Sequence, residues 1–382
     1  MNNNTKRLAS LDILRGADIF FLTVICVIVE SFHHVWPLPK WVMTQLGHPA
    51  WVGFTVLDMV MPLFIFMCGA ALPLALPKRL EADGSAGWRY WRHVLGRVGL
   101  LWILGMVAQG EILSFDLHRI SFFNNTLQTI ACGYLVTAAV MRLRSYAVRV
   151  AIGFALAVVY TVFLHACGDM TPTGNAAVVY EVKFLTLFYP DATWHPVSQI
   201  ADWHYTWWPT IPMFGFMALG GALATEIVKG GLQPNRKVLA LAGAGVGLLA
   251  LGGLFATFDP IVKHIFTASF TFLATGVAFL LYALFYWTFD VVGVRRGTGL
   301  ISLFGRHSLL AYMCIETTCR GILWTAAAVL LGGPDRKIGH GLTRFFSEPA
   351  AGLLMTVAIA ALLCLVLFYW ERWQKQSKAA GK

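Results

Sequence analysis

Two ionisable side chains, His48 and Asp58, stand ten residues apart in the sequence His-Pro-Ala-Trp-Val-Gly-Phe-Thr-Val-Leu-Asp, where a long apolar segment begins. Imidazole titrates near neutral pH and can act as a base, an acid or a nucleophile. Ten residues of straight helix make nearly three turns, so contact between the two side chains requires a bent approach to the helix. The pattern predicts proton-transfer or nucleophilic chemistry at His48, and a structural histidine at a membrane surface is the alternative.

A second polar group opens the first apolar run of the chain. Asp12 and Arg15 are three residues apart and so share one helical face. Amides at a helix N-terminus, together with an arginine, can hold a phosphate. The alternative is that Asp12 caps the helix and that Arg15 extends to the membrane surface. Arg97 approaches a later apolar run from the same predicted side and is a candidate for the same phosphate site.

Other polar side chains lie at the ends or in the interior of apolar runs. Asn125 and Gln128 fall within one turn and either bond neighbouring helices or contact a ligand. Lys263 either orients an anionic group or extends to the surface. Glu30 and Glu316 are interior carboxylates, which tend to face a bundle interior or a cavity. The spacing of the histidines does not fit a metal site, so we expect no metal.

The composition requires a bilayer as the solvent. Of the 382 residues, 58% are hydrophobic and only 13% are charged, which would leave a soluble domain with large exposed apolar patches. We therefore predict an all-α, polytopic membrane protein with about ten transmembrane helices. The predicted spans are 12–32, 51–77, 93–113, 124–141, 147–166, 206–228, 237–257, 265–289, 308–332 and 349–371.

The distribution of basic residues predicts the orientation of these spans. Lysine and arginine are concentrated in the connections that share a side with the two chain ends, as at 78–79 and 142–149. Because basic residues stay preferentially in the cytoplasm, both ends are predicted to be cytoplasmic and His48 to face the far side. This topology accounts for the net charge of +10, and no basic stripe with interleaved aromatics indicates nucleic-acid binding.

The chain is predicted to form a single membrane domain over 1–382, with a far-side loop at about 167–205. That loop and the residues after it are rich in tryptophan, as at Trp194, Trp203 and Trp207. Such residues form either an aromatic belt at the membrane surface or a platform for sugar rings. The first apolar run lacks a cleavage site of small residues and is expected to be a retained helix.

Several short motifs, taken together, resemble a known family. They are Arg7-Leu-Ala-Ser-Leu-Asp12-Ile-Leu-Arg15-Gly, then His48-x-x-Trp51-x-Gly-x-x-x-x-Asp58 with Pro62, then Asn125-Thr-Leu-Gln128, Pro260-x-x-Lys263 and Gly305-x-His307-Ser. In this order they resemble the transmembrane acyltransferases related to heparan-alpha-glucosaminide N-acetyltransferase, and in particular bacterial homologues of the DUF5009 type. The resemblance runs from about residue 7 to 316. It departs from the heparan enzyme at Cys26 and His307, where that enzyme carries asparagines, so heparan itself is not the expected substrate.

The resemblance implies transfer of an acetyl group from cytoplasmic acetyl-CoA, as acyl donor, to a sugar on the other side of the membrane. It matches His48 to the catalytic histidine and Asp58 to a nearby helix aspartate. Around them we expect CoA contacts and substrate contacts from separate groups of residues. The expected CoA contacts are Asp12, Arg15, Arg97, Asn125 and Gln128, and the expected substrate contacts are Glu30, Trp51 and Lys263.

Two other classes of protein remain compatible with the sequence. A secondary transporter of an anionic or sugar-linked substrate would also place Asp, Glu, Arg and His within a helical bundle. A non-catalytic membrane scaffold would tolerate substitution at the motif residues. The expected partners are acetyl-CoA, a sugar or glycan acceptor, the lipid bilayer and a second copy of the chain, with no nucleic acid. The expected location is a bacterial inner membrane.

Overall fold

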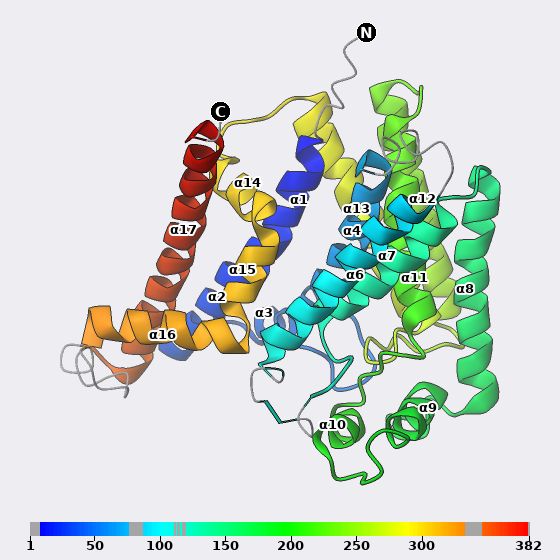
Figure 1. The fold of residues 1–382 in the computed structure, drawn as a ribbon, viewed down its shortest axis with the longest axis horizontal. Helices are drawn as coiled ribbons and strands as arrows, with labels where there is room; N and C mark the ends of the chain where they lie inside the picture. Colours follow the sequence, from blue (N-terminus) through cyan, green and yellow to red (C-terminus); the bar gives the residue numbers. More distant parts are fainter. Residues whose placement is uncertain are drawn as a thin grey trace. The chain divides into compact units, whose positions relative to one another are not determined.

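The computed structural model describes residues 8–75, 87–110, 112, 115–116, 120–332 and 346–380, with side chains at all of these positions except 317–319, 332 and 380 (Figure 1). Arg7 of the first motif and the basic residues at 78–79 lie outside the described residues. The described chain is helical and contains no strand, only an isolated bridge between Val52 and Val262. This confirms the predicted all-α class.

The chain divides into two compact units, each built from several stretches of sequence. Unit 1 contains residues Met1–Leu11, Pro49–Phe54 and Met61–Gly293, and unit 2 contains Asp12–His48, Thr55–Val60 and Val294–Lys382. The prediction of a single membrane domain over 1–382 stays a prediction.

Unit 1 holds most of the helices in the middle of the chain. They are α4 (Val60–Ala75, from Met61 onward), α6 (Trp88–Gln109), α7 (Thr126–Val140), α8 (Tyr146–Cys167), α9 (Ala176–Leu185), α10 (His195–Trp203), α11 (Ile211–Lys229), α12 (Pro234–Phe255) and α13 (Ala268–Phe285), which the π-helical segment η5 (Tyr286–Val291) continues.

Glycines allow the central helices of unit 1 to approach closely. Helix α11 packs against α7 and α8, and α12 packs along α13 (Figure 1). A Cβ atom on Gly221 of α11 would overlap the carbonyl oxygen of Phe66 in α4, and one on Gly69 of α4 would overlap that of Ala218. Small residues at such crossings bring backbones together, which is how helices associate within a membrane. The core of unit 1 therefore depends on backbone proximity.

Unit 2 combines the two ends of the chain. Its first helical stretch consists of α1 (Ala9–Phe20, from Asp12 onward), the π-helical segment η1 (Phe21–Ile25) and α2 (Cys26–Val35). Helix α2 packs against α17, and Gly16 and Gly305 bring α1 and α14 into backbone contact. The remaining elements are α3 (Lys40–Gln45), η2 (Leu57–Met59), α14 (Gly299–Arg306), α15 (Ser308–Ile315), α16 (Thr317–Gly332) and α17 (Glu348–Ala380).

Within the described ranges, six helices are long and apolar enough to cross a membrane. They are Leu57–Ala75, Tyr146–Cys167, Ile211–Lys229, Pro234–Phe255, Ala268–Val291 and Glu348–Ala379. The pair Ser308–Ile315 and Arg320–Leu331, bent by 73°, makes a seventh if it is one broken span. These helices support a polytopic membrane protein.

Three of the ten predicted spans are absent from this set, namely 12–32, 93–113 and 124–141. Helix α7 has 15 residues, about 22 Å of helix, which is short of a hydrocarbon core of about 30 Å. Helix α6 carries Arg89, Arg92 and Arg97, which make it more polar than the others. The first run is divided by the π turn η1. The count of ten and the orientation stay predictions.

Candidate functional site

His48 and Asp58 are in direct contact within unit 2. The Nδ1 atom of His48 lies 2.6 Å from Oδ1 of Asp58. The imidazole is 43% exposed, whereas the aspartate side chain is fully buried. Asp58 lies in the 3-10 turn η2, directly before α4, so the chain between the two residues is not one straight helix. The bent approach that a contact requires is therefore present.

The second oxygen of Asp58 is held by the turn in which the residue lies. Oδ2 accepts a hydrogen bond from the Thr55 amide at 3.1 Å. The Thr55 hydroxyl lies 3.0 Å from the same oxygen and 2.8 Å from the Gly47 carbonyl oxygen, to either of which it can donate its one proton. Sequence reasoning missed Thr55, although a threonine three residues before an acidic residue is a known turn pattern. The carboxylate is thereby oriented toward His48.

This arrangement defines what the imidazole can do. With Nδ1 donating to a buried carboxylate, the neutral ring carries its lone pair on Nε2. The carboxylate also stabilises the imidazolium that forms when Nε2 takes up a proton. The pair therefore has the parts of a general base or of an imidazole nucleophile, presented on a partly exposed ring.

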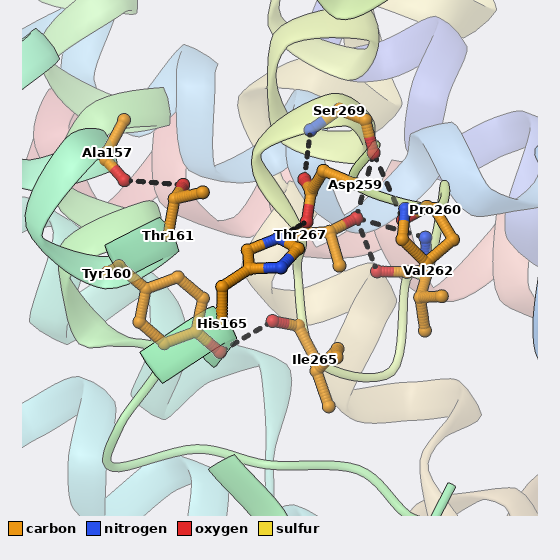
Figure 2. A network of polar contacts seen from close by, with 10 residues as sticks. All are labelled: Ala157, Tyr160, Thr161, His165, Asp259, Pro260, Val262, Ile265, Thr267 and Ser269. Carbon is orange, nitrogen blue, oxygen red and sulfur yellow. Dashed lines mark hydrogen bonds and ion pairs between the residues drawn. The ribbon is translucent and has the colours of Figure 1, made fainter. Parts of the chain in front are cut away.

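Unit 1 contains another histidine and aspartate pair, which sequence reasoning missed (Figure 2). Nε2 of His165, in the last turn of α8, lies 3.0 Å from Oδ1 of Asp259. The other oxygen of Asp259 accepts from the Ser269 amide at 3.0 Å, in the first turn of α13. Because Asp259 satisfies an amide at a helix N-terminus, it has a structural task. The partners are 94 residues apart, so no local pattern predicts the pair.

The loop before α13 is fixed by the hydrogen bonds drawn in Figure 2. The Ser269 hydroxyl donates to the Pro260 carbonyl oxygen at 3.1 Å, and the Val262 amide donates to the Thr267 hydroxyl at 3.0 Å. The Tyr160 hydroxyl donates to the Ile265 carbonyl oxygen at 2.6 Å. This network holds the loop that carries Lys263, a predicted substrate contact that is 7% exposed.

Trp51, another predicted substrate contact, belongs to an aromatic cluster of unit 1. Its ring stacks on that of His264 at 5.5 Å between centroids and meets His204 edge-on at 6.1 Å. Tyr205 lies 4.3 Å from His264. The indole Nε1 of Trp51 donates to the Met170 carbonyl oxygen at 2.8 Å. The aromatic residues of this region therefore pack on one another, which neither the belt nor the platform hypothesis had included.

The predicted CoA contacts have identifiable positions. Asn125 and Gln128 form a capping box at the start of α7, in which Asn125 Oδ1 accepts from the Leu127 amide and Gln128 Oε1 accepts from the Asn125 amide. The guanidinium of Arg97 lies 4.9 Å from the centre of the Tyr134 ring. These residues belong to unit 1. Capping is thus an observed task of Asn125 and Gln128, and contact with a ligand stays a prediction.

The start of α1 differs from the expected cap. Asp12 lies inside α1, which begins at Ala9, so the alternative in which Asp12 is the N-cap is wrong. The Ala9 and Ser10 amides donate instead to the two carboxylate oxygens of Asp290, at 3.2 and 3.0 Å. An acidic side chain thus occupies part of the predicted anion site. Asp12 and Arg15 belong to unit 2, together with Glu30, His48 and Asp58.

Among the described residues, no group of three or more His, Cys, Asp and Glu side chains is arranged to hold a metal ion.

The described chain is helical, and the length and composition of its apolar helices are consistent with the class of polytopic membrane proteins. Within that class, residues 7–191 match the family model described as Domain of unknown function (DUF5009). No curated protein matches the chain. The chain is therefore similar to this uncharacterised family over just under half of its length, in the part that contains His48 and Asp58.

Proposed function

We propose that this protein is a membrane-bound acyltransferase that moves an acetyl group from cytoplasmic acetyl-CoA to an extracytoplasmic amino sugar or glycan. One observation carries the proposal: Nδ1 of the partly exposed His48 ring lies 2.6 Å from Oδ1 of the fully buried Asp58 carboxylate. The Thr55 amide holds the other oxygen of that carboxylate. The motif resemblance, which matches His48 to a catalytic histidine and Asp58 to a nearby helix aspartate, supports it. We further propose about ten spans, with both chain ends in the cytoplasm of a bacterial cell.

In this mechanism, His48 Nε2 takes the proton from the acceptor N–H or O–H while the acceptor atom attacks the thioester carbonyl carbon. The carbon–sulfur bond breaks, and the imidazolium returns its proton to the leaving sulfur. Alternatively, Nε2 attacks the thioester carbonyl carbon, and the carbon–sulfur bond breaks to release the CoA thiolate. The acceptor then attacks the acetyl group on the imidazole, the bond to Nε2 breaks, and the acceptor's proton goes to the thiolate. In both routes Asp58 stabilises the positive charge on the ring and holds its orientation.

The other contacts follow the sequence prediction. Arg15 and Arg97 are assigned to the CoA phosphates, because a guanidinium binds phosphate with paired hydrogen bonds. Asp12, Asn125 and Gln128 are assigned to the same substrate, and Asn125 and Gln128 also cap α7. Glu30, Trp51 and Lys263 are assigned to the acceptor. A homodimer remains part of the proposal.

The test is release of the CoA thiol from acetyl-CoA by purified protein in detergent, with a panel of amino sugars and glycan fragments as acceptors. We expect His48→Ala to lower turnover on the order of 10³-fold and Asp58→Asn on the order of 10²-fold, as for loss of a general base and of its orienting partner. The matched control is His165→Ala, which removes the imidazole of the other pair and should leave turnover near that of the unmodified protein.

Three outcomes would contradict the assignment. Turnover that is unchanged in His48→Ala removes the role given to His48. An equal loss in His165→Ala means that the effect is not specific to the His48 pair. No binding of acetyl-CoA at all would reject the acyltransferase and favour the transporter.

A further inference from the structure

Unit 2 contains a cavity of about 840 Å³ whose lining includes Glu30, which is assigned above to the acceptor, but neither His48 nor Asp58. It is lined by residues of η1, α2, α15, α16 and α17 and of the break between α15 and α16. Its volume falls in the usual range for small-molecule sites, about 300–1,000 Å³. The cavity is therefore large enough to hold the head and part of the chain of an amphiphile.

Among the described residues, the charged side chains that line the cavity carry more negative than positive charge. In this part of the chain, three carboxylates line it, from Glu30, Glu316 and Glu348, against the guanidinium of Arg320 and the imidazole of His34. In the described part of the chain, the carboxylates of Glu30 and Glu348 make no ion pair or hydrogen bond. Both of these side chains are exposed, so their carboxylates are accessible to a positively charged ligand. The cavity is thus suited to a positively charged ligand.

A helix break adds to this preference. Helix α15 ends at Ile315, and Glu316 has an extended backbone with ψ at 164° before α16 begins. The two helical segments are bent by 73°. The carbonyl groups of the last turn of α15 carry the negative end of the helix dipole, and Cys314 and Ile315 of that turn line the cavity. Broken helices supply ion-binding groups in this way in other membrane proteins.

A buried hydroxyl group provides an independent sign of a ligand. Thr23 lines the cavity and is only 5% exposed. Its hydroxyl oxygen has no hydrogen-bond partner within the described residues. Buried polar groups are nearly always hydrogen-bonded, so an unpartnered one indicates a missing donor or acceptor. Thr23 lies in the π-helical segment η1, a type of distortion that is frequent at functional sites.

The rest of the lining is mostly apolar, apart from the Ser31 and Thr356 hydroxyl groups, which lie 2.8 Å from each other. It includes aliphatic side chains at Leu22, Val27, Leu353 and Ile359 and the indole of Trp324. We propose that the cavity binds an amphiphilic primary amine, with its ammonium group between the carboxylates of Glu30, Glu316 and Glu348 and its apolar chain along this wall. Thr23 accepts a hydrogen bond from the head, and Arg320 pairs with a phosphate where the head carries one.

Two sources can supply this chemistry, a free long-chain amine or the ethanolamine head of a phospholipid. The probes are octylamine and dihexanoyl phosphatidylethanolamine. Their control ligands, which lack the primary ammonium group, are octanol and dihexanoyl phosphatidylcholine. Binding to the full-length protein in an uncharged detergent is measured without acetyl-CoA, so the result is independent of the proposed acetyl transfer.

We expect both amine probes to bind, and the two control ligands to bind at least tenfold more weakly. The double substitution Glu30→Gln and Glu348→Gln should weaken both amines at least tenfold, while Arg320→Gln should weaken only the phospholipid. Asp202→Asn, which removes an exposed carboxylate of unit 1, is the matched control. If the double variant does not fold, Glu348→Gln alone and Thr23→Val are measured instead. Each should weaken the binding of octylamine.

Unchanged octylamine affinity in the folded variants would overturn the proposal. Equal binding of octanol and octylamine would also overturn it, because the carboxylates would then not select the ligand. Binding of octylamine without the phospholipid would identify a free amine as the source, and the reverse would identify the lipid head.

Discussion

The two histidine and aspartate pairs described above have similar geometry. Asp58 and Asp259 are both fully buried, and the rings of His48 and His165 are 43% and 34% exposed. The difference lies in the second oxygen of each carboxylate. That of Asp58 accepts from the Thr55 amide in its own turn, whereas that of Asp259 accepts from the Ser269 amide in the first turn of α13. A pair of this kind is therefore insufficient as a catalytic signature. A role for one pair can be assigned only when variants of both pairs are compared.

Glu181 of α9 allows a prediction at the scale of one residue. Its Oε2 accepts from the Trp207 and Trp208 amides at 2.6 and 3.0 Å, and its Oε1 has no partner among the described residues. Burial raises the pKa of this carboxyl group from 4.5 to about 8, against the opposing effect of the two amides. The folded protein thus holds a proton that the unfolded chain releases near pH 4.5.

The consequence is a loss of stability as the pH rises. The stabilising effect of the proton is complete below pH 4.5, declines above it and is lost once the pH passes about 8. We expect the midpoint temperature of thermal denaturation to decrease as the pH is raised from 5 to 8.5. Glu181→Gln should flatten this dependence, because the glutamine oxygen still accepts from both amides but does not ionise. An equally steep dependence in the variant would contradict the assignment to Glu181.

At the scale of single residues, the sequence allows further predictions about the site. Pro49 and Gly53, which has a φ of +149°, lie between His48 and Asp58 and signal a break that allows the two to meet. Asn125 and Gln128, three residues apart before an apolar run, form a recognisable capping box. The His165 and Asp259 pair could not be predicted, because only the packing of α8 against the loop before α13 brings it together.

At the scale of the helix, hydropathy predicts apolar runs better than it predicts continuous spans. The runs at 147–166 and 237–257 correspond closely to α8 and α12. The run at 308–332 is instead broken at Glu316, and a π turn interrupts the run at 12–32. Backbone distortions of this kind depend on tertiary contacts, and a sliding average over apolar residues does not contain them. They are also the places where the polar residues Thr23 and Glu316 occur.

Close approach of α11 and α4 gives a prediction for an element. An added methyl group at Gly221 would overlap the Phe66 carbonyl oxygen, so Gly221→Ala should force the two helices apart. Overpacking of this kind costs about 1–3 kcal/mol, and we expect a lower midpoint of thermal unfolding in detergent. The control is Gly243→Ala on α12, where nothing lies within 4 Å of the new Cβ atom. Equal midpoints for the two variants would reject the close crossing.

At the scale of the whole molecule, the composition predicts the membrane class but not the division of the chain into two compact units. Unit 2 joins residues 12–48 to residues after 293, and unit 1 takes the six residues Pro49–Phe54 from between His48 and Thr55. Hydropathy assigns each apolar run separately and contains no information on which runs pack together. The predicted site residues accordingly fall in both units, with Arg97 and Lys263 in unit 1 and Arg15 and Glu30 in unit 2.

The orientation of the chain in its membrane can be tested with two exposed positions. Ala192 lies in the predicted far-side loop, and Ser377 lies near the end of α17, on the predicted cytoplasmic side. In a background in which the seven native cysteines are replaced, Ala192→Cys should react with an impermeant maleimide on intact spheroplasts. Ser377→Cys should react only after permeabilisation, because basic residues retain that end in the cytoplasm. The opposite labelling pattern would place His48 on the cytoplasmic side, and the proposed transfer of an acetyl group across the membrane would then have to be abandoned.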